Sequence, residues 1–435
     1  MSRFLAPAAL FAACLATPVA ATGLSPAEAR IKATIAADAA RNEALLERLV
    51  LQNSGTLNLP GVARVGEMMR AELAPLDFEV RWVDMKDTGR TGHLIATHKG
   101  DGRGKRVLLI GHLDTVFEPD SHFTGFRRDG TRAIGPGVGD DKGGMVVIVA
   151  ALRAMQAAGT LKGADVMVVL TGDEERSGKP LSRSRADLIA AGRWADVALE
   201  YEGLAVTPGG DAGTVARRGA TDWELVTTGV PGHSGGVFGA ELGYGANYEL
   251  ARILDGFRRE LPEANLTANV GVLAGGTPAG FVGDSFTGTA SGKTNIVAER
   301  AVARGDLRAL TPEQEAAARA KMQAIVAQHL PRTGATLTFN EGYPPMAPTA
   351  GNRALLARLN AVNRDLGLPD MPEYDPAKRG AADSSFVAAD ADTIGGMGAA
   401  GGGAHADGEW VDLPSIQRQG LRSAILISRL AAERR

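Results

Sequence analysis

The sequence of 435 residues predicts an α/β protein in two parts: a mostly parallel sheet with helices on both faces, and a second, inserted α/β unit. In the first half of the chain, short apolar runs alternate with helical segments, as in a parallel sheet that is covered on both faces. The order then changes to strand, helix, strand, strand, helix, strand, which is typical of a ferredoxin-like unit. The length also favours two domains over a single core.

The first part of the chain supplies the elements of the parallel sheet. Residues 26–51 are charged and alanine-rich with helical spacing, and residues 60–73 have the spacing of a second helix. An apolar helix at 145–158 begins directly after a pair of glycines. Buried strands are predicted at 78–83, 93–98, 106–110, 166–170 and 197–201.

The inserted unit has its own strands and helices. A capping box with proline at the first helical position, Thr311-Pro312-Glu313-Gln314, predicts the start of a helix that reaches about residue 330. The other helix of the unit is predicted at 244–260. Its four strands are predicted at 223–228, 266–273, 297–307 and 335–340.

The segment after the inserted unit is expected to return to the first sheet. Residues 352–366 and 413–434 have helical spacing. Between them, a glycine-dense loop at 395–403 leads to His405. Such a loop is either a flexible linker or a place where the backbone passes close to a site.

Composition and the N-terminus indicate an exported protein. The chain is 44% hydrophobic and 22% charged with a net charge of −3, which excludes disorder and gives no nucleic-acid footprint. Residues 1–21 have a basic start, an apolar stretch and a small-residue cleavage site, so they predict a signal peptide. The mature protein is therefore expected in the periplasm or outside the cell, without a membrane anchor. The single cysteine, Cys14, lies in this segment, so the mature chain has no disulfide. Lipidation of Cys14 is the alternative, against which Phe11 argues.

Four segments carry residues of the metal-ligand type. His112-Leu113-Asp114, Asp173-Glu174-Glu175 and Glu202 each follow a predicted strand, and Asp140-Asp141 precedes the apolar helix. Because ligands of open α/β sheets bind beyond the carboxyl ends of the strands, we expect these residues to meet at one edge. Imidazole and carboxylate groups together suit zinc or a similar divalent ion.

Each segment also has a simpler interpretation. The stretch 135–144 is rich in glycine like a phosphate-binding loop, but it lacks the Gly-Lys-Ser/Thr ending and carries two aspartates, so a metal-binding loop or a solvated turn fits better. Glu174 and Glu175 cannot point the same way in an extended segment, so one is free to bind a metal and the other to act as a base, unless both are surface charges. His233 is either a loop histidine or a donor to developing negative charge.

Together these segments resemble the M20 metallopeptidases, most closely their glutamate carboxypeptidase (carboxypeptidase G2-like) branch. The resemblance spans nearly all of the mature chain in the same order. The family's motifs correspond to His112-Leu113-Asp114, Asp140-Asp141-Lys142-Gly143-Gly144, Asp173-Glu174-Glu175, Glu202 (with Glu200 as the neighbouring alternative), Gly229-Val230-Pro231-Gly232-His233 and His405.

The resemblance implies a domain plan and a set of roles. It implies a di-zinc catalytic domain at 22–215 and 343–435, and a lid and dimerisation domain at 216–342 through which a homodimer forms. It further implies a cis peptide bond between Asp140 and Asp141. The resemblance implies two Zn²⁺ per subunit bridged by Asp140, with His112 and Glu202 on one ion and Glu175 and His405 on the other. It implies Glu174 as the general base and Asp114 as support for His112. It also implies His233 as the oxyanion donor, and Asn295 and Arg308 as ligands of the substrate carboxylate.

The expected function is that of an exported zinc carboxypeptidase, which hydrolyses the amide bond before a C-terminal amino acid of a peptide or N-acyl amino acid. For an acidic C-terminal residue the pocket needs a cation, yet residues 340–343 are not basic. Arg217-Arg218 and Lys378-Arg379 are candidate replacements. An aminoacylase or dipeptidase with the same metal site is the nearest alternative, and a non-catalytic peptide- or metal-binding protein is a more distant one.

Overall fold

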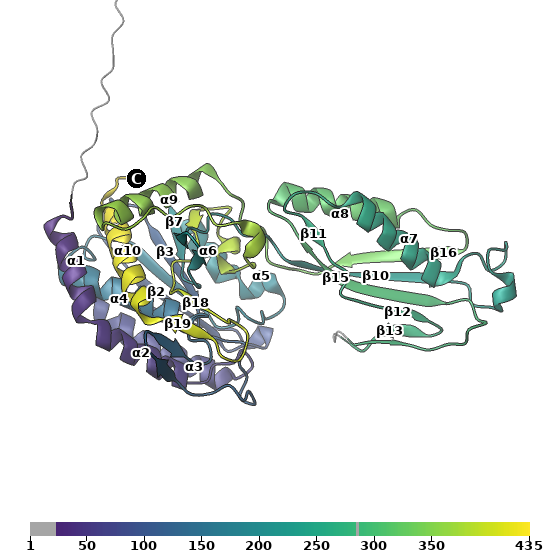
Figure 1. Ribbon diagram of the computed structural model, residues 1–435, viewed down its shortest axis with the longest axis horizontal. Helices are drawn as coiled ribbons and strands as arrows, with labels where there is room; N and C mark the ends of the chain where they lie inside the picture. The colour runs from purple at the N-terminus through teal and green to yellow at the C-terminus, as the bar shows by residue number, and fades with distance from the viewer. Residues whose placement is uncertain (1–22, 284–286) are drawn as a thin grey trace, which may run out of the picture.

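The computed structural model describes residues 23–283 and 287–435. The predicted signal peptide, 1–21, and Cys14 within it lie outside the described residues. The chain forms two bodies joined by a narrow neck (Figure 1). The larger body contains the N-terminal and C-terminal parts of the described chain, and the smaller one is inserted between them. Within these residues, no helix is both long and apolar enough to span a membrane.

The larger body is built on a six-stranded sheet, which confirms the predicted mostly parallel α/β fold. The strands β6, β3, β7 and β17 run parallel, and β2 and β1 add an antiparallel edge. The pairing of β17 with β7 confirms that the chain returns to this sheet after the insertion. In spatial order the strands are β1 (Glu79–Asp84), β2 (Gly92–His98), β6 (Val166–Thr171), β3 (Val107–His112), β7 (Val197–Glu200) and β17 (Asp392–Ile394).

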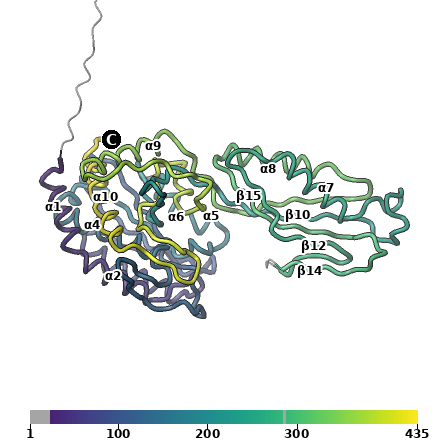
Figure 2. The backbone as a smooth tube through the Cα atoms, viewed as in Figure 1, coloured from purple at the N-terminus to yellow at the C-terminus, as the bar shows by residue number. Residues whose placement is uncertain are grey.

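Alternating side chains of the sheet pack into two cores. On β3, Leu109 joins the core beneath the larger helical layer, whereas Leu108 and Ile110 join the core on the opposite face, beneath α6 (Ala186–Trp194). Figure 2 shows the C-terminal α10 beside α1, and the two helices pack together. The larger layer consists of α1 (Pro26–Ala37), α2 (Ala39–Leu51), α3 (Leu59–Leu73), α4 (Lys142–Ala158), α9 (Ala350–Asp365) and α10 (Leu413–Ala432).

Four features differ from the prediction. The expected helix at 26–51 is two helices, because Asp38 leaves the helical conformation at φ −86° and ψ 4°. The helices α5 (Leu181–Ser184) and α6 were not predicted. A short hairpin of β8 (Ala205–Thr207) and β9 (Gly210–Ala212) was also not predicted. The same holds for a four-stranded sheet, which consists of β18 (Gly401–Gly402), β19 (Trp410–Asp412), β5 (Arg132–Ile134) and β4 (Arg127–Asp129).

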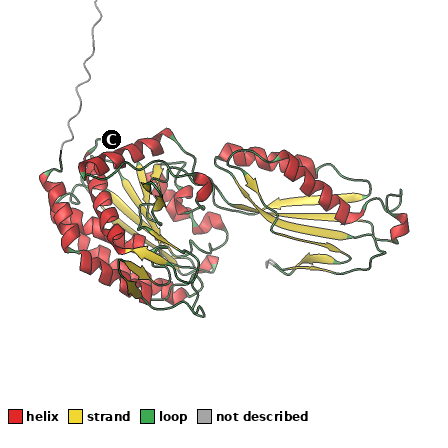
Figure 3. Ribbon diagram, viewed as in Figure 1, coloured by secondary structure: helices red, strands yellow, loops and turns green. Residues whose placement is uncertain are grey.

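The smaller body, called the second body below, spans 221–339 and has the predicted order of strands and helices. Its sheet is antiparallel, with β10 and β15 in the middle, and two helices cover one face (Figure 3). The predicted strand at 266–273 is divided into two, and the hairpin β13 (Ala279–Phe281) and β14 (Gly288–Ala290) is additional. The main elements are β10 (Thr221–Gly229), α7 (Gly245–Glu260), β11 (Thr267–Ala268), β12 (Val272–Gly276), β15 (Arg300–Arg308), α8 (Pro312–Val326) and β16 (Thr333–Phe339).

The second body has a core of its own. Trp223 packs edge-on against Phe257, with ring centroids 5.8 Å apart, and Ile253 and Met322 complete the contact between the helices and the sheet. The neck consists of two antiparallel segments, with pairing of Arg217 to Met346 and of Ala220 to Tyr343. The residue limits of the domains stay predictions.

Candidate metal centre

The carboxyl ends of three parallel strands bring the predicted ligand segments together. His112 is the last residue of β3 and lies in register with Thr171, the last residue of β6. Glu200 ends β7, opposite Ile110 of β3. The loops that follow these strands therefore leave the sheet at one edge, as predicted.

Asp140 lies between two histidines at this edge. Its Oδ1 is 3.0 Å from His112 Nε2, and its Oδ2 is 3.2 Å from His405 Nε2. His405 Nε2 is also 3.1 Å from Glu175 Oε2. The Asp140–Asp141 peptide bond is cis, as predicted.

Two groups of side chains have the spacing of metal ligands. Ligand atoms of His112, Asp140 and Glu175 lie within 4.8 Å of one another, and so do those of His112, Glu174 and Glu202. The first group is close to His405, so the structure brings all five predicted metal residues and the predicted base to one place. We call His112, Asp140, Glu174, Glu175, Glu202 and His405 the strand-end cluster.

The chemistry of the cluster fits a pair of divalent cations. Burial and the neighbouring carboxylates of Glu200 and Asp140 raise the pKa of Glu202 to about 8. One oxygen of Glu175, Oε1, is buried and has no hydrogen-bond partner among the described residues. Hydrogen bonds to Asp140 and Glu175 raise the pKa of His405 to about 10. Crowded acids and protonated imidazoles are the groups whose protons a bound metal displaces.

Asp114 supports the cluster through the backbone as well as through its side chain. Its carboxylate accepts hydrogen bonds from the amides of Glu174 (3.0 Å) and Glu175 (3.1 Å) and from the Thr56 hydroxyl (2.7 Å). His112 Nδ1 lies 3.1 Å from the Asp114 backbone oxygen and 3.5 Å from its carboxylate. Asp114 thus contacts the second ring nitrogen of His112, where support was predicted, and also fixes the loop of the paired glutamates.

Glu409 holds the loop that carries Asp140, a role that the sequence did not indicate. Its buried carboxylate accepts hydrogen bonds from the amides of Gly139 (2.7 Å), Asp140 (2.9 Å) and Gly137 (2.8 Å). The strand β19 begins at the next residue and pairs with β5. The only signal in the sequence was the position of Glu409 four residues after His405.

Arg217 contacts both candidate acids at the end of β7, Glu200 and Glu202. Its Nη2 lies 3.0 and 2.9 Å from the two oxygens of Glu200 and 2.9 Å from Glu202 Oε2. Glu200 also accepts a hydrogen bond from the Gly396 amide at 3.0 Å. Glu200 is therefore committed to structural contacts, and Glu202 is the acid that reaches the cluster.

Among the described residues, no hydrogen bond or ion pair joins the three predicted residues of the second body to the strand-end cluster of the same subunit. His233 is exposed, and its ring nitrogen accepts a hydrogen bond from the Gly235 amide. The backbone oxygen of Asn295 accepts a hydrogen bond from the Ser234 amide at 2.9 Å, so these two segments are adjacent. Arg308 forms an ion pair with Asp306 at 2.7 Å. Their roles stay predictions.

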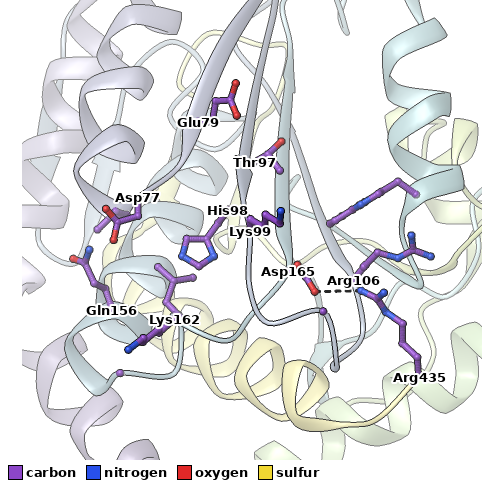
Figure 4. Close-up of a pocket in the computed structure, with 15 residues that line it drawn as sticks. Asp77, Glu79, Thr97, His98, Lys99, Arg106, Gln156, Lys162, Asp165 and Arg435 are labelled. Carbon is purple, nitrogen blue, oxygen red and sulfur yellow. Dashed lines mark hydrogen bonds and ion pairs between the residues drawn. The ribbon is translucent and has the colours of Figure 1, made fainter.

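Two cavities lie at opposite ends of the main sheet, and the smaller one contains residues of the strand-end cluster. A cavity of about 910 Å³ lies at the opposite end of the sheet, where His98, Lys99 and Asp165 line it (Figure 4). It contains none of the strand-end cluster. A smaller cavity of about 160 Å³ adjoins the cluster, and its lining includes Asp140 and Glu202.

The chain is similar to known peptidases. It matches peptidase family M20/M25/M40 over residues 108–422. It is 27% identical to carboxypeptidase G2 from Pseudomonas sp. (strain RS-16) over 393 residues, which cover 89% of this chain and 88% of that protein.

Solved structures share the fold. The aminopeptidase PepT from Bacillus cereus superposes with a TM-score of 0.70 and 18% identity, covering 91% of this chain and 99% of that one. The YXEP protein from Bacillus subtilis, described as a dinuclear metal binding peptidase of the M20 family, gives a TM-score of 0.60 and 15% identity, with 91% and 99% covered. Since the family match covers most of its length, the chain belongs to peptidase family M20/M25/M40, a family of metal-dependent hydrolases.

Proposed function

We propose that this protein is an exported zinc carboxypeptidase that removes a C-terminal amino acid, with preference for an acidic one, from peptides or N-acyl amino acids. The observation that carries the proposal is the position of Glu174, a candidate base, within the same cluster as five metal-type ligands. The similarity to carboxypeptidase G2 over 88% of that protein supports the reaction class. A purely binding protein would not need the base.

The proposed metal ligands follow the positions in the cluster. His112 and Glu202 would hold one ion and Glu175 and His405 the other, with the Asp140 carboxylate between the two pairs. When bound, two zinc ions supply an activated water and a polarised substrate carbonyl. Arg217 and Glu409 keep Glu202 and Asp140 in place through the contacts described above.

Glu174 is proposed to move the proton. It accepts a proton from the attacking water and delivers it to the leaving nitrogen. Burial and the neighbouring Glu202 raise the pKa of Glu174 well above its usual value, which favours a group that both takes up and releases a proton. Its backbone is fixed on two sides, since its amide donates to Asp114 and its carbonyl accepts from the Tyr343 hydroxyl at 2.9 Å.

The second body is proposed to complete the site of the partner subunit in a homodimer. His233 supports the oxyanion of the tetrahedral intermediate and Asn295 holds the substrate carboxylate beside it, while Arg308 is proposed to hold that carboxylate from the neck side of the second body. Support comes from the adjacent positions of the His233 and Asn295 segments at the Arg300 end of β15 and from the exposure of His233, whereas Arg308 lies at the other end of this strand, beside the neck.

Replacement of Glu174 by Gln tests the base. We expect Glu174→Gln to lower kcat by at least about a hundredfold, because it removes proton transfer but keeps the shape of the side chain. Hydrolysis of a panel of N-acyl amino acids, dipeptides and acidic oligopeptides measures this effect, and product analysis separates carboxypeptidase from aminoacylase and dipeptidase. Glu260→Gln, an exposed acid at the end of α7, is the matched control and should keep normal rates.

Metal analysis of the same proteins completes the test. Both variants should bind two zinc ions, and chelation should abolish hydrolysis by the wild-type protein until zinc is restored. Near-normal hydrolysis by the zinc-loaded Glu174→Gln protein would show that Glu174 is not the base. Hydrolysis that survives complete metal removal would contradict a metal-dependent reaction.

The contacts of Glu409 predict an effect on metal affinity. Glu409→Gln places an amide donor opposite backbone donors, so the Asp140 loop loses part of its anchorage. We expect zinc to bind about 10- to 100-fold more weakly, the usual cost of losing a group that orients a ligand. Competition with a chelating dye measures the affinity. Glu373→Gln, which removes a surface ion pair with Arg353, is the control, and equal affinities in the two variants would count against the role of Glu409.

The shared site predicts complementation between two inactive variants. If His233 acts on the partner's substrate, mixed dimers of His233→Ala and Glu174→Gln subunits contain one intact site. We expect subunit exchange to restore about one quarter of wild-type activity in an equal mixture. No recovery, despite dimers observed by sedimentation, would mean that His233 acts within its own subunit or not at all.

Export predicts a shortened mature chain. Expression with secretion should give a protein that begins at Thr22, because the signal peptide is cleaved after Ala21. Intact-mass measurement checks this result. A chain that begins at an acylated Cys14 would show lipidation instead, and a full-length chain would contradict export by this route.

A further inference from the structure

The small cavity beside the metal centre has one cationic wall. It has a volume of about 160 Å³, and Arg379 is the only basic residue among the described residues that line it. Arg379 directly follows the short helix η4 (Pro376–Lys378) of the larger body. Its neighbours in the lining include Asp140, Glu202, Gly203, Gly402, Glu409 and Trp410. A ligand in this cavity would therefore touch both the cluster and Arg379.

The other cations near the site are already occupied. Arg217 is buried and pairs with both Glu200 and Glu202. Arg218 donates to the Thr267 hydroxyl and to the Ala377 carbonyl, outside the cavity. Arg185 is fully buried between Asp173 and Asp383. An acidic C-terminal residue needs a cation in its pocket, and residues 340–343 supply none. None of these three side chains is free to take that place.

Arg379 itself has unused hydrogen-bonding capacity. Its Nη2 donates to the Gly203 carbonyl at 2.7 Å. Its Nε is buried and has no acceptor among the described residues. A buried donor without an acceptor costs free energy, and a guanidinium offers five donors, so an anion with two oxygens would improve the site.

The acids around Arg379 are balanced by other groups. Arg217 offsets Glu200, and three backbone amides bind the carboxylate of Glu409. Under the proposed function, the charges of Asp140 and Glu202 are offset by the metal ions that they bind. The positive charge of Arg379 then remains for a ligand, and its planar fork matches a carboxylate.

We propose that Arg379 binds a carboxylate of the substrate in this cavity, and so selects C-terminal residues that place an anion beside the metal centre. The proposal rests on the proposed function, because it assumes that the substrate reaches the strand-end cluster. An acidic C-terminal residue has two carboxylates, one on the main chain and one on the side chain. Both have the required chemistry, and three matched substrates distinguish them.

The test compares N-benzoyl-glutamate, N-benzoyl-glutamine and the α-amide of N-benzoyl-glutamate on the zinc-loaded protein. We expect the wild-type protein to favour the glutamate over one of the two amides by about tenfold or more in kcat/KM, which is the worth of a charge-assisted hydrogen bond. The poorer amide identifies the carboxylate that Arg379 binds. Arg379→Gln should abolish the preference by raising KM for N-benzoyl-glutamate, with little change in kcat.

Two further variants separate recognition from support of the metal ligands. Arg379→Lys keeps the charge and should restore part of the preference. Lys378→Gln removes the exposed neighbouring charge and should change nothing. Zinc content and melting temperature should stay at wild-type values in all three variants. A loss of zinc from Arg379→Gln with an equal fall in the rates on all substrates would show that Arg379 serves Glu202, and would overturn the proposal.

Binding measurements keep the two proposals distinguishable. If the zinc-loaded wild-type protein hydrolyses none of the three substrates, the carboxypeptidase proposal fails, but the anion site is still tested by calorimetric titration with glutarate and with its monoamide. We expect wild-type protein to bind glutarate at least about tenfold more tightly than the monoamide, and Arg379→Gln to bind both alike. Equal binding of the two compounds by wild-type protein would overturn the anion site.

Discussion

The site depends on the fixed position of one carboxylate, that of Asp140, between two histidines. His112 reaches Asp140 from the end of β3, and His405 reaches it from a loop near the C-terminus. His405 has a φ of 64°, a left-handed conformation that is rare for residues other than glycine and is often found at functional sites. The small sheet that contains β5 and β19 joins the two regions, and Glu409 accepts hydrogen bonds from the amides of Asp140 and of the loop directly before it. The β3 end, the Asp140 loop and the segment that carries His405 must therefore all be in place before the strand-end cluster can form.

Buried ion pairs hold the other loops at this edge of the sheet. A charge removed from water is tolerated when a partner and hydrogen bonds compensate for the lost solvation. Arg217 joins Glu200 to Glu202, and Arg185 joins Asp173 to Asp383. Each pair connects a residue near a strand end to another segment of the same body. The acids of the cluster thus lie on loops whose backbones are fixed independently of any ligand.

Local sequence patterns predicted the long elements and the ligands next to them. Apolar runs located β3 and β6, and the position of His112 and of the paired glutamates at their ends followed from the geometry of parallel sheets. His405 came from the family resemblance, because a glycine-rich loop has no periodicity. The contacts of Glu409 and Arg217 could not be predicted, since each joins segments that are distant in the sequence or side chains with no motif. Strands of two or three residues, such as β18 and β17, are too short for an alternating pattern to appear.

The pairing of Ala220 with Tyr343 at the neck also bears on how the protein can be altered. The chain leaves the larger body and returns to it at neighbouring positions. The second body is therefore an insertion that can be removed or exchanged without changing the connections of the main sheet. The junction is not neutral, however, because the Tyr343 hydroxyl contacts the backbone of Glu174 and the guanidinium of Arg185. A chimera that exchanges the second body therefore has to retain Tyr343 on the recipient side, or the replacement will disturb the loop of the paired glutamates that it was meant to leave unchanged.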